Sequence, residues 1–184
     1  MIRLHDVTCG YGDNLPLRQF SCTLPNTGVV AISGASGSGK TTLLRLLLGR
    51  LPLLGGYIEG LAGLRFSVVF QEDRLLPWRT AAQNILLVNP AAPAEALLRD
   101  LGLEDAGSVY PPALSGGMQR RVAIARALAY PADVLLLDEP FKGLDDETRA
   151  RVIARVRGAM PLTLLVTHDA EEAALLGAAE TIQL

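Results

Sequence analysis

The sequence has 184 residues, of which 49% are hydrophobic and 20% are charged. This composition is typical of a globular domain and excludes a disordered chain. The formal net charge of −2 excludes a general electrostatic attraction to nucleic acid or to an anionic membrane.

The first half of the chain predicts strands followed by helices. IRLHDVT and QFSCTL alternate weakly and predict antiparallel strands, with the turn-forming stretch CGYGDNLPL between them. The apolar run 28–34 predicts a buried parallel strand, and TTLLRLLLG a helix that ends at Gly49. GGYIEG and LRFSVVF predict strands, whereas TAAQNILLV and PAEALLRDLG predict helices on either side of the break NPAAP.

The second half alternates between helices and buried strands. SGGMQRRVAIARALAY predicts a helix with Ser115 as its cap, and DVLLLDEP a buried strand that ends in two carboxylates. DDETRARVIARVRG predicts an amphipathic helix, LTLLVTHD a third buried strand, DAEEAALLG a short helix and ETIQL a last strand. This alternation predicts an α/β fold with a mainly parallel core sheet.

The sequence shows no signal for export or for crossing a membrane. It begins MIRLHDV, without an apolar signal segment, and no apolar run approaches the ~18 residues that span a bilayer. Cys9 and Cys22 could form one disulfide, but free and partly buried thiols in a reducing cytosol are the favoured interpretation. Any role at a membrane is therefore expected to depend on a partner.

The stretch GASGSGKTT matches the phosphate-loop pattern G-x-x-x-x-G-K-[ST] between an apolar strand and a helix. Glycines let backbone N–H groups surround phosphate oxygens, and the helix N-terminus adds partial positive charge. Lys40 is expected on the β and γ phosphates, Thr41 on Mg²⁺ and Thr42 on a neighbouring phosphate. The sequence thus predicts a P-loop NTPase core whose phosphate-binding residues are Gly34, Ala35, Ser36, Gly37, Ser38, Gly39, Lys40, Thr41 and Thr42.

Polar side chains at three other predicted strand ends are expected to join this loop at one sheet edge. Asp138 is the candidate Mg²⁺ ligand, and Glu139 the candidate base that polarises the attacking water. Gln71 could contact Mg²⁺ or that water, and His168 could sense the γ phosphate. The alternatives are an acidic strand cap for the carboxylates, a polar strand terminator for Gln71 and a structural histidine for His168.

The phosphate loop, FQ, LSGGMQRR, LLLDEP, GLD and TH follow one another as in ABC-type ATPases, and the chain resembles that family from Tyr11 to His168. The resemblance implies head-to-tail dimers in which Ser115, Gly116 and Gly117 contact the γ phosphate of the partner's ATP. It also implies that Tyr11 stacks on adenine, although a plain turn tyrosine is the alternative, and that Asp145 communicates across the dimer. Lys142 departs from the serine found in many members, which weakens the expected contact there.

The stretch FQEDRLLPW resembles ATP-binding subunits of importers for nitrate, sulfonate, taurine and related solutes. The resemblance implies a single ABC ATPase domain over 1–184, with an N-terminal antiparallel β subdomain and a helical subdomain near 72–130. The membrane subunit would contact that helical subdomain, or the same side chains would instead close its own core. These candidate contact residues are Glu72, Asp73, Leu75, Leu76 and Trp78.

The resemblance implies an ATP-hydrolysing transporter subunit that uses ATP and Mg²⁺ and works on the cytoplasmic face of the inner membrane. Its implied partners are a second copy, integral membrane permease subunits and an external solute-binding protein, with no nucleic acid. One alternative is a soluble ABC ATPase that acts on a macromolecular partner. Another is a non-catalytic nucleotide-binding module, against which the intact Lys40, Asp138, Glu139 and His168 argue.

Overall fold

The computed structural model describes all 184 residues and contains two sheets. The smaller sheet is antiparallel, with strand order β2-β1-β4, and consists of β1 (Ile2–Tyr11), β2 (Asn14–Leu24) and β4 (Gly55–Glu59). The predicted strands are confirmed, but CGYGDNLPL is wrong as a long connector because Tyr11 already pairs with Asn14 across a tight turn. Gly10 permits this close pairing, since a Cβ there would lie 2.2 Å from the Asn14 carbonyl oxygen.

The larger sheet is parallel throughout and has the strand order β5-β6-β7-β3-β8. Every residue of the two central strands is buried, which explains their continuous apolar sequences. The predicted α/β fold with a parallel core is therefore confirmed. Its strands are β3 (Gly28–Ser33), β5 (Phe66–Val69), β6 (Val134–Asp138), β7 (Leu162–Val166) and β8 (Glu180–Gln183).

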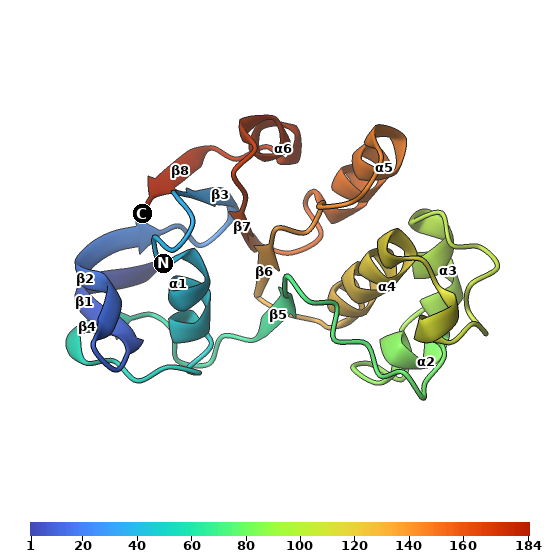
Figure 1. The fold of residues 1–184 in the computed structure, drawn as a ribbon, viewed down its shortest axis with the longest axis horizontal. Coiled ribbons are helices and arrows are strands. Elements are labelled where there is room, and N and C mark those ends of the chain that lie inside the picture. Colours follow the sequence, from blue (N-terminus) through green and yellow to red (C-terminus); the bar gives the residue numbers. More distant parts are fainter.

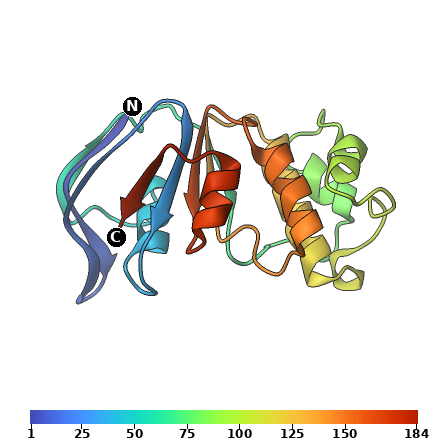
Figure 2. The ribbon, with the colours of Figure 1, turned by 90° about the horizontal axis from the view of Figure 1, so that it is seen from above.

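The helices flank the parallel sheet, and Figure 1 shows α2, α3 and α4 gathered at the end opposite the antiparallel sheet. Figure 2 shows α5 and α6 along the side of the molecule between these two ends. None of the helices has the length and apolar character that a membrane span requires. The helical elements are α1 (Lys40–Leu47), α2 (Ala81–Leu86), α3 (Ala94–Asp100), the 3₁₀ turn η1 (Pro111–Ala113), α4 (Gly116–Ala129), α5 (Asp146–Val156) and α6 (Ala170–Leu176).

Two apolar cores lie on opposite faces of the parallel sheet. Alternate residues of β6 divide between them: Leu135 and Leu137 pack with α2, α3, α4 and α5, whereas Val134 and Leu136 pack with α1 and the antiparallel sheet. This alternation follows from the opposite directions of successive side chains along a strand. The sheet therefore joins the two ends of the molecule through shared strands. Cys9 is buried, Cys22 is half-buried, and both are free thiols.

Candidate functional site

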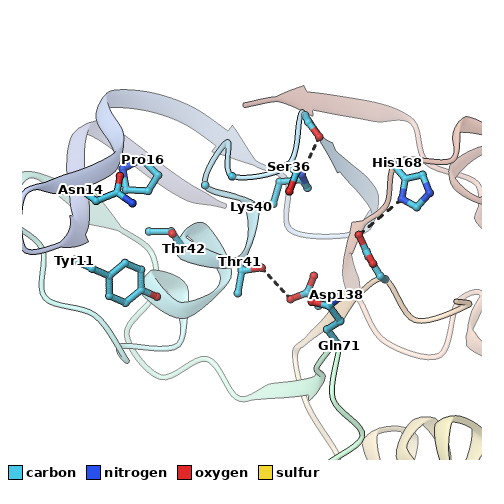
Figure 3. Close-up of a pocket in the computed structure, with 14 residues that line it drawn as sticks. Tyr11, Asn14, Pro16, Ser36, Lys40, Thr41, Thr42, Gln71, Asp138 and His168 are labelled. Atoms are coloured by element: carbon cyan, nitrogen blue, oxygen red, sulfur yellow. Dashed lines mark hydrogen bonds and ion pairs between the residues drawn. The ribbon is translucent and has the colours of Figure 1, made fainter. Parts of the chain in front are cut away.

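A cavity of about 460 Å³ opens where β3, β6 and β7 end, at the carboxyl edge of the parallel sheet (Figure 3). Ligands bind at this edge in α/β proteins because the connecting loops and helix N-termini converge there. The cavity has one hydrophobic residue in its lining. Its lining residues are Tyr11, Asn14, Pro16, Gly34, Ser36, Gly37, Gly39, Lys40, Thr41, Thr42, Gln71, Asp138, Glu139 and His168.

The phosphate loop leads from β3 into the N-terminus of α1. Gly39, at the helix N-cap, has φ 108°, and Gly37 has φ 82°, conformations that glycine adopts without steric cost. No side chain caps α1 and its first turn has no acidic residue, so its N–H groups are available to an anion. Lys40 Nζ donates to the carbonyl oxygens of Gly34 and Ala35 at 2.8 and 2.7 Å.

Asp138, the last residue of β6, is 4% exposed and faces Thr41 across the cavity. The Thr41 hydroxyl donates to Asp138 Oδ2 at 3.2 Å. Burial raises the pKa of Asp138, and the hydrogen bond from Thr41 opposes that rise. The neighbouring groups of the protein therefore do not fully balance the negative charge of the Asp138 carboxylate.

The donor set around Asp138 fits a magnesium ion. A carboxylate, the hydroxyl of Thr41 and the amide of Gln71 line the same cavity and can all present oxygen. Mg²⁺ is usually held by one or two carboxylates together with phosphate oxygens and water. The burial that raises the pKa of Asp138 leaves its ionised form poorly solvated, and a cation beside it would stabilise that form.

Glu139 follows β6 directly and is held in a conformation unusual for a residue with a side chain. Its φ is 46°, in the left-handed region, and its N–H donates to the Val166 carbonyl oxygen at 3.0 Å. One carboxylate oxygen lies 3.8 Å from His168 Nδ1 and the other 3.7 Å from Lys142 Nζ. The carboxylate and the exposed His168 ring thus lie together at the cavity, as expected from the sequence.

Gln71 enters the cavity just beyond the end of β5, and an arginine of α4 holds its backbone. Arg120 is 7% exposed and donates to the carbonyl oxygens of Phe70, at 2.6 Å, and of Gln71. Its Nε also lies 3.1 Å from Asp73 Oδ1. These hydrogen bonds were not predicted from the sequence, because Arg120 lies 50 positions from Phe70 and 49 positions from Gln71.

The arginines of α4 bind backbone more than they bind acidic side chains. Arg126 donates to the carbonyl oxygens of Asp73 and Arg74, both at 2.8 Å. Arg121 donates to those of Leu101 and Gly102 at 3.0 and 2.9 Å. The three arginines of α4 therefore fasten the loops before α2 and after α3 to this helix.

Tyr11 lies at the end of β1 with 43% of its surface exposed, and it lines the cavity as expected. Arg45 Nη1 donates to its hydroxyl at 2.6 Å. Asn14 and Pro16 also line the cavity and were missed in the sequence. The pairing of Tyr11 with Asn14 explains their presence, because the same hairpin carries all three residues.

The remaining predicted residues do not line this cavity. Ser115 caps α4, and its hydroxyl accepts from the Met118 N–H at 3.2 Å. Asp145 caps α5 by accepting from the Thr148 N–H at 2.9 Å, and this contact lowers the pKa of Asp145. A Cβ at Gly116 would meet no atom within 4 Å, so the fold of this chain does not itself require glycine there.

The expected contact surface after Gln71 is divided between core and solvent. Leu75 packs against the helical core, whereas Trp78 is 69% exposed. The fully buried Asn84 fixes the loop, since its amide accepts from the Leu76 N–H and donates to the Leu76, Arg79 and Thr80 carbonyl oxygens. Leu75 therefore helps to close the core of the helical subdomain, whereas Trp78 is accessible to a partner.

Comparison with known proteins gives the same picture over most of the chain. The sequence pattern of the ABC transporter family matches residues 17–142. An aliphatic sulfonates import ATP-binding protein of Frankia alni is 46% identical over 171 residues, which cover 89% of this chain and 69% of that protein. A protein of the same name from Nocardia farcinica is 40% identical over 184 residues, covering 96% of this chain and 77% of the relative.

Two solved structures share the fold across the whole chain. The dimeric post-hydrolysis state of the ATP-binding cassette MJ0796, bound to ADP and Pi, matches with a TM-score of 0.85 and 27% identity. The match covers 94% of that chain. A bacterial Atm1-family ABC exporter with ATP bound matches with a TM-score of 0.87 and 25% identity. The match covers 37% of that chain. The chain therefore belongs to the ABC transporter family and is one of its ATP-hydrolysing members.

Proposed function

We propose that the chain is the ATP-hydrolysing subunit of a small-solute importer and that ATP binds in the cavity beside the phosphate loop. One observation carries this proposal: the phosphate loop, Asp138 and Glu139 face a single cavity at the sheet edge. This arrangement brings anion-binding N–H groups, a metal-binding carboxylate and a candidate base within reach of one triphosphate.

The phosphates lie against the α1 N-terminus, where N–H groups and the helix dipole favour negative charge. Lys40 exchanges its hydrogen bonds to Gly34 and Ala35 for the β and γ phosphate oxygens. Thr41, Asp138 and Gln71 hold Mg²⁺, which supplies positive charge to the phosphates when it is bound. Tyr11, at the opposite side of the loop, stacks on the adenine ring.

Glu139 is the group that accepts a proton from the attacking water. Its backbone conformation and its hydrogen bond to Val166 fix the start of the side chain at the cavity. His168 lies beside the carboxylate, at 3.8 Å, and contacts the γ phosphate. Positioning the water against a fixed base removes the entropic cost of assembling them.

A second copy of the chain completes the site from outside. Ser115 and Gly116 are exposed and Gly117 is half-buried at the N-terminus of α4, whose first N–H groups favour an anion. The open space around Gly116 suits a phosphate approaching close to the backbone. We propose a homodimer in which this turn covers the partner's ATP and Asp145 contacts the partner's loops.

Membrane permease subunits bind the surface around the exposed Trp78, on the cytoplasmic side of the membrane. Dimer closure on ATP moves that surface, and hydrolysis releases it. The names of the Frankia alni and Nocardia farcinica relatives favour aliphatic sulfonates as the solute. We propose that an external solute-binding protein delivers it. The segment fixed by Arg120 connects the nucleotide cavity with this surface.

The test compares wild type with Glu139→Gln, which keeps the side-chain size and removes the base. We expect hydrolysis to fall by at least ~100-fold while ATP still binds, and the variant to form an ATP-dependent dimer measurable by size-exclusion chromatography. Normal turnover by Glu139→Gln would refute the assigned base. Capture of ribosomes or nucleic acid, with no permease subunit, would refute the transport role and favour a soluble ABC ATPase.

A further inference from the structure

Arg45 connects the helix that presents the phosphate site with Tyr11, the residue proposed to stack on adenine. It lies on α1 one turn after Thr41, so the helix that presents the phosphate site also carries Arg45. Its Nη1 donates to the Tyr11 hydroxyl at 2.6 Å, and its guanidinium carbon lies 5.8 Å from the centre of the Tyr11 ring. The side chain thus reaches from the phosphate-binding helix to the end of β1.

Tyr11 depends on this contact for its orientation. It occupies the last position of β1, beside a two-residue turn in which Gly12 has φ 55°. The ring is 43% exposed, and the hydrogen bond from Arg45 is the one side-chain hydrogen bond that Tyr11 makes. A half-exposed ring on a hairpin tip keeps several rotamers unless a second point fixes it.

We infer that Arg45 is a positioning residue that fixes the Tyr11 ring for stacking on adenine, at a set distance from the phosphate loop. The inference rests on the proposed role of Tyr11 in the site above. A charged donor gives a stronger hydrogen bond than a neutral one, so the ring is held before the nucleotide arrives. Arg45 therefore contributes to binding of the base while making no contact with it.

A second role for Arg45 predicts a different outcome. Arg45 also lines a small hollow of about 80 Å³ together with Thr41, Gln71 and Asp138. Its positive charge is the weakest of the influences that act on the pKa of Asp138, and it lowers that pKa. If Arg45 acted chiefly through these metal-binding residues, it would affect any magnesium-bound polyphosphate, with or without a base.

The experiment measures the KM and kcat for ATP and inhibition by magnesium tripolyphosphate, which has no base. The variants are Arg45→Met, Arg45→Lys, Tyr11→Phe, Tyr11→Ala and the double variant Arg45→Met with Tyr11→Phe. Arg99→Met, an exposed arginine on α3, is the matched control for loss of charge. Thermal unfolding of each variant shows whether the fold is retained.

We expect Arg45→Met and Tyr11→Phe each to raise the KM for ATP by about 3- to 10-fold, the effect of one lost hydrogen bond. The kcat and the tripolyphosphate inhibition constant stay within about two-fold, and the double variant is no worse than either single variant. Arg45→Lys restores part of the affinity because it keeps a charged donor. Tyr11→Ala gives a larger loss, of at least ~10-fold, since the stacking ring itself is removed.

Three results would overturn the inference. Equal weakening of ATP and tripolyphosphate by Arg45→Met would place its action at the phosphates or the metal. Additive losses in the double variant would show that Arg45 does not act through the Tyr11 hydroxyl. A loss with Tyr11→Ala but none with Arg45→Met or Tyr11→Phe would refute the positioning role alone, whereas no loss with Tyr11→Ala would refute the proposed stacking role as well.

Discussion

Glu139 combines the carboxylate proposed as the base with backbone strain at the same residue. A residue with a Cβ in the left-handed region costs on the order of 1 kcal/mol, and Glu139 has φ 46°. The chain leaves β6 at this point, so the unusual turn directs the side chain toward the cavity instead of along the sheet. The strain is therefore part of how the carboxylate is placed.

Because of this strain, we expect that a substitution at Glu139 can increase stability while it abolishes activity. Glu139→Gly is expected to abolish hydrolysis and to raise the free energy of unfolding by about 1 kcal/mol or less, because glycine adopts the turn without strain. Glu139→Gln, which keeps the Cβ, serves as the control and should leave stability nearly unchanged. Urea denaturation measures the difference, and a less stable glycine variant would contradict the argument.

Asp138 gives a second residue-scale prediction, one that depends on pH. Burial raises its pKa, so the folded chain binds the Asp138 proton more tightly than the unfolded chain does. At pH values above the ordinary pKa of an aspartate, the buried and ionised Asp138 carboxylate therefore lowers the stability of the fold. Without nucleotide, Asp138→Asn should be more stable than wild type at pH 8, and this gain should shrink as the pH is lowered toward 4.

The same variant should lose hydrolysis by at least ~100-fold, because the carboxylate proposed to hold Mg²⁺ is gone. Asp105→Asn, at an exposed position, is the matched control and should change neither property. Denaturation curves at several pH values test the stability gain. A gain that grew as the pH fell would contradict the direction of the pKa shift.

At the scale of elements, the buried strands were predictable and the contacts between distant segments were not. β6 and β7 have continuous apolar sequences that fit a strand buried on both faces. The hairpin after Cys9 was misplaced because its turn formers do not reveal that Gly10 allows two strands to approach closely. The contacts of Arg120 depend on how α4 packs beside β5, which no local pattern encodes.

The candidate site follows the same division. The phosphate loop, Asp138, Glu139 and His168 could be predicted to converge because each lies at the end of a strand of one parallel sheet or just after it. Asn14 and Pro16 could not, since their place in the cavity depends on where the antiparallel sheet lies against α1. Strand direction is therefore readable from a sequence, while the packing of one sheet on another is not.

Arg120 supports a prediction about how α4 holds the segment around Gln71. Arg120→Met removes the donors to the Phe70 and Gln71 carbonyl oxygens and leaves Asp73 without its partner, at a cost of about 3 kcal/mol. Amide exchange in residues 70–74 should accelerate, because their anchor is lost. Arg120→Lys should give an intermediate effect, since one ammonium cannot replace a forked donor.

Arg155→Met is the control for this measurement. Arg155 lies 3.0 Å from Asp100, and both side chains are partly exposed. Its loss should cost about 0 to 1 kcal/mol and leave amide exchange in residues 70–74 unchanged. Equal effects of the two methionine variants would show that the burial of Arg120 carries no special weight.

At the scale of the whole molecule, the two segments proposed to contact nucleotide lie far apart in one chain. The phosphate loop lies beside the antiparallel sheet, whereas the Ser115 turn begins α4 near the opposite end (Figure 1). Ser115 does not line the cavity that contains Lys40. In a head-to-tail pair of chains, the phosphate loop of each chain lies opposite the Ser115 turn of the other. Two-fold symmetry produces both contacts at once.

This arrangement predicts that two inactive variants restore activity when they are mixed. Lys40→Ala disables the phosphate loop, and Gly116→Asp puts a negative charge where the partner's phosphate would approach, in a space that the chain itself leaves open. Each variant alone should lose hydrolysis by at least ~100-fold. In a mixed dimer one site combines both defects, and the other combines two intact halves.

An equal mixture should therefore regain about a quarter of wild-type hydrolysis, since about half of the dimers are mixed and each of these has one intact site. The control is an equal mixture of Lys40→Ala with a chain that carries both substitutions: every phosphate loop is then defective, so no dimer has an intact site. Hydrolysis that rises with concentration in the first mixture and not in the second would support the shared site. If Gly116→Asp alone hydrolyses ATP at the normal rate, the turn at Ser115 has no part in catalysis and the head-to-tail dimer is wrong.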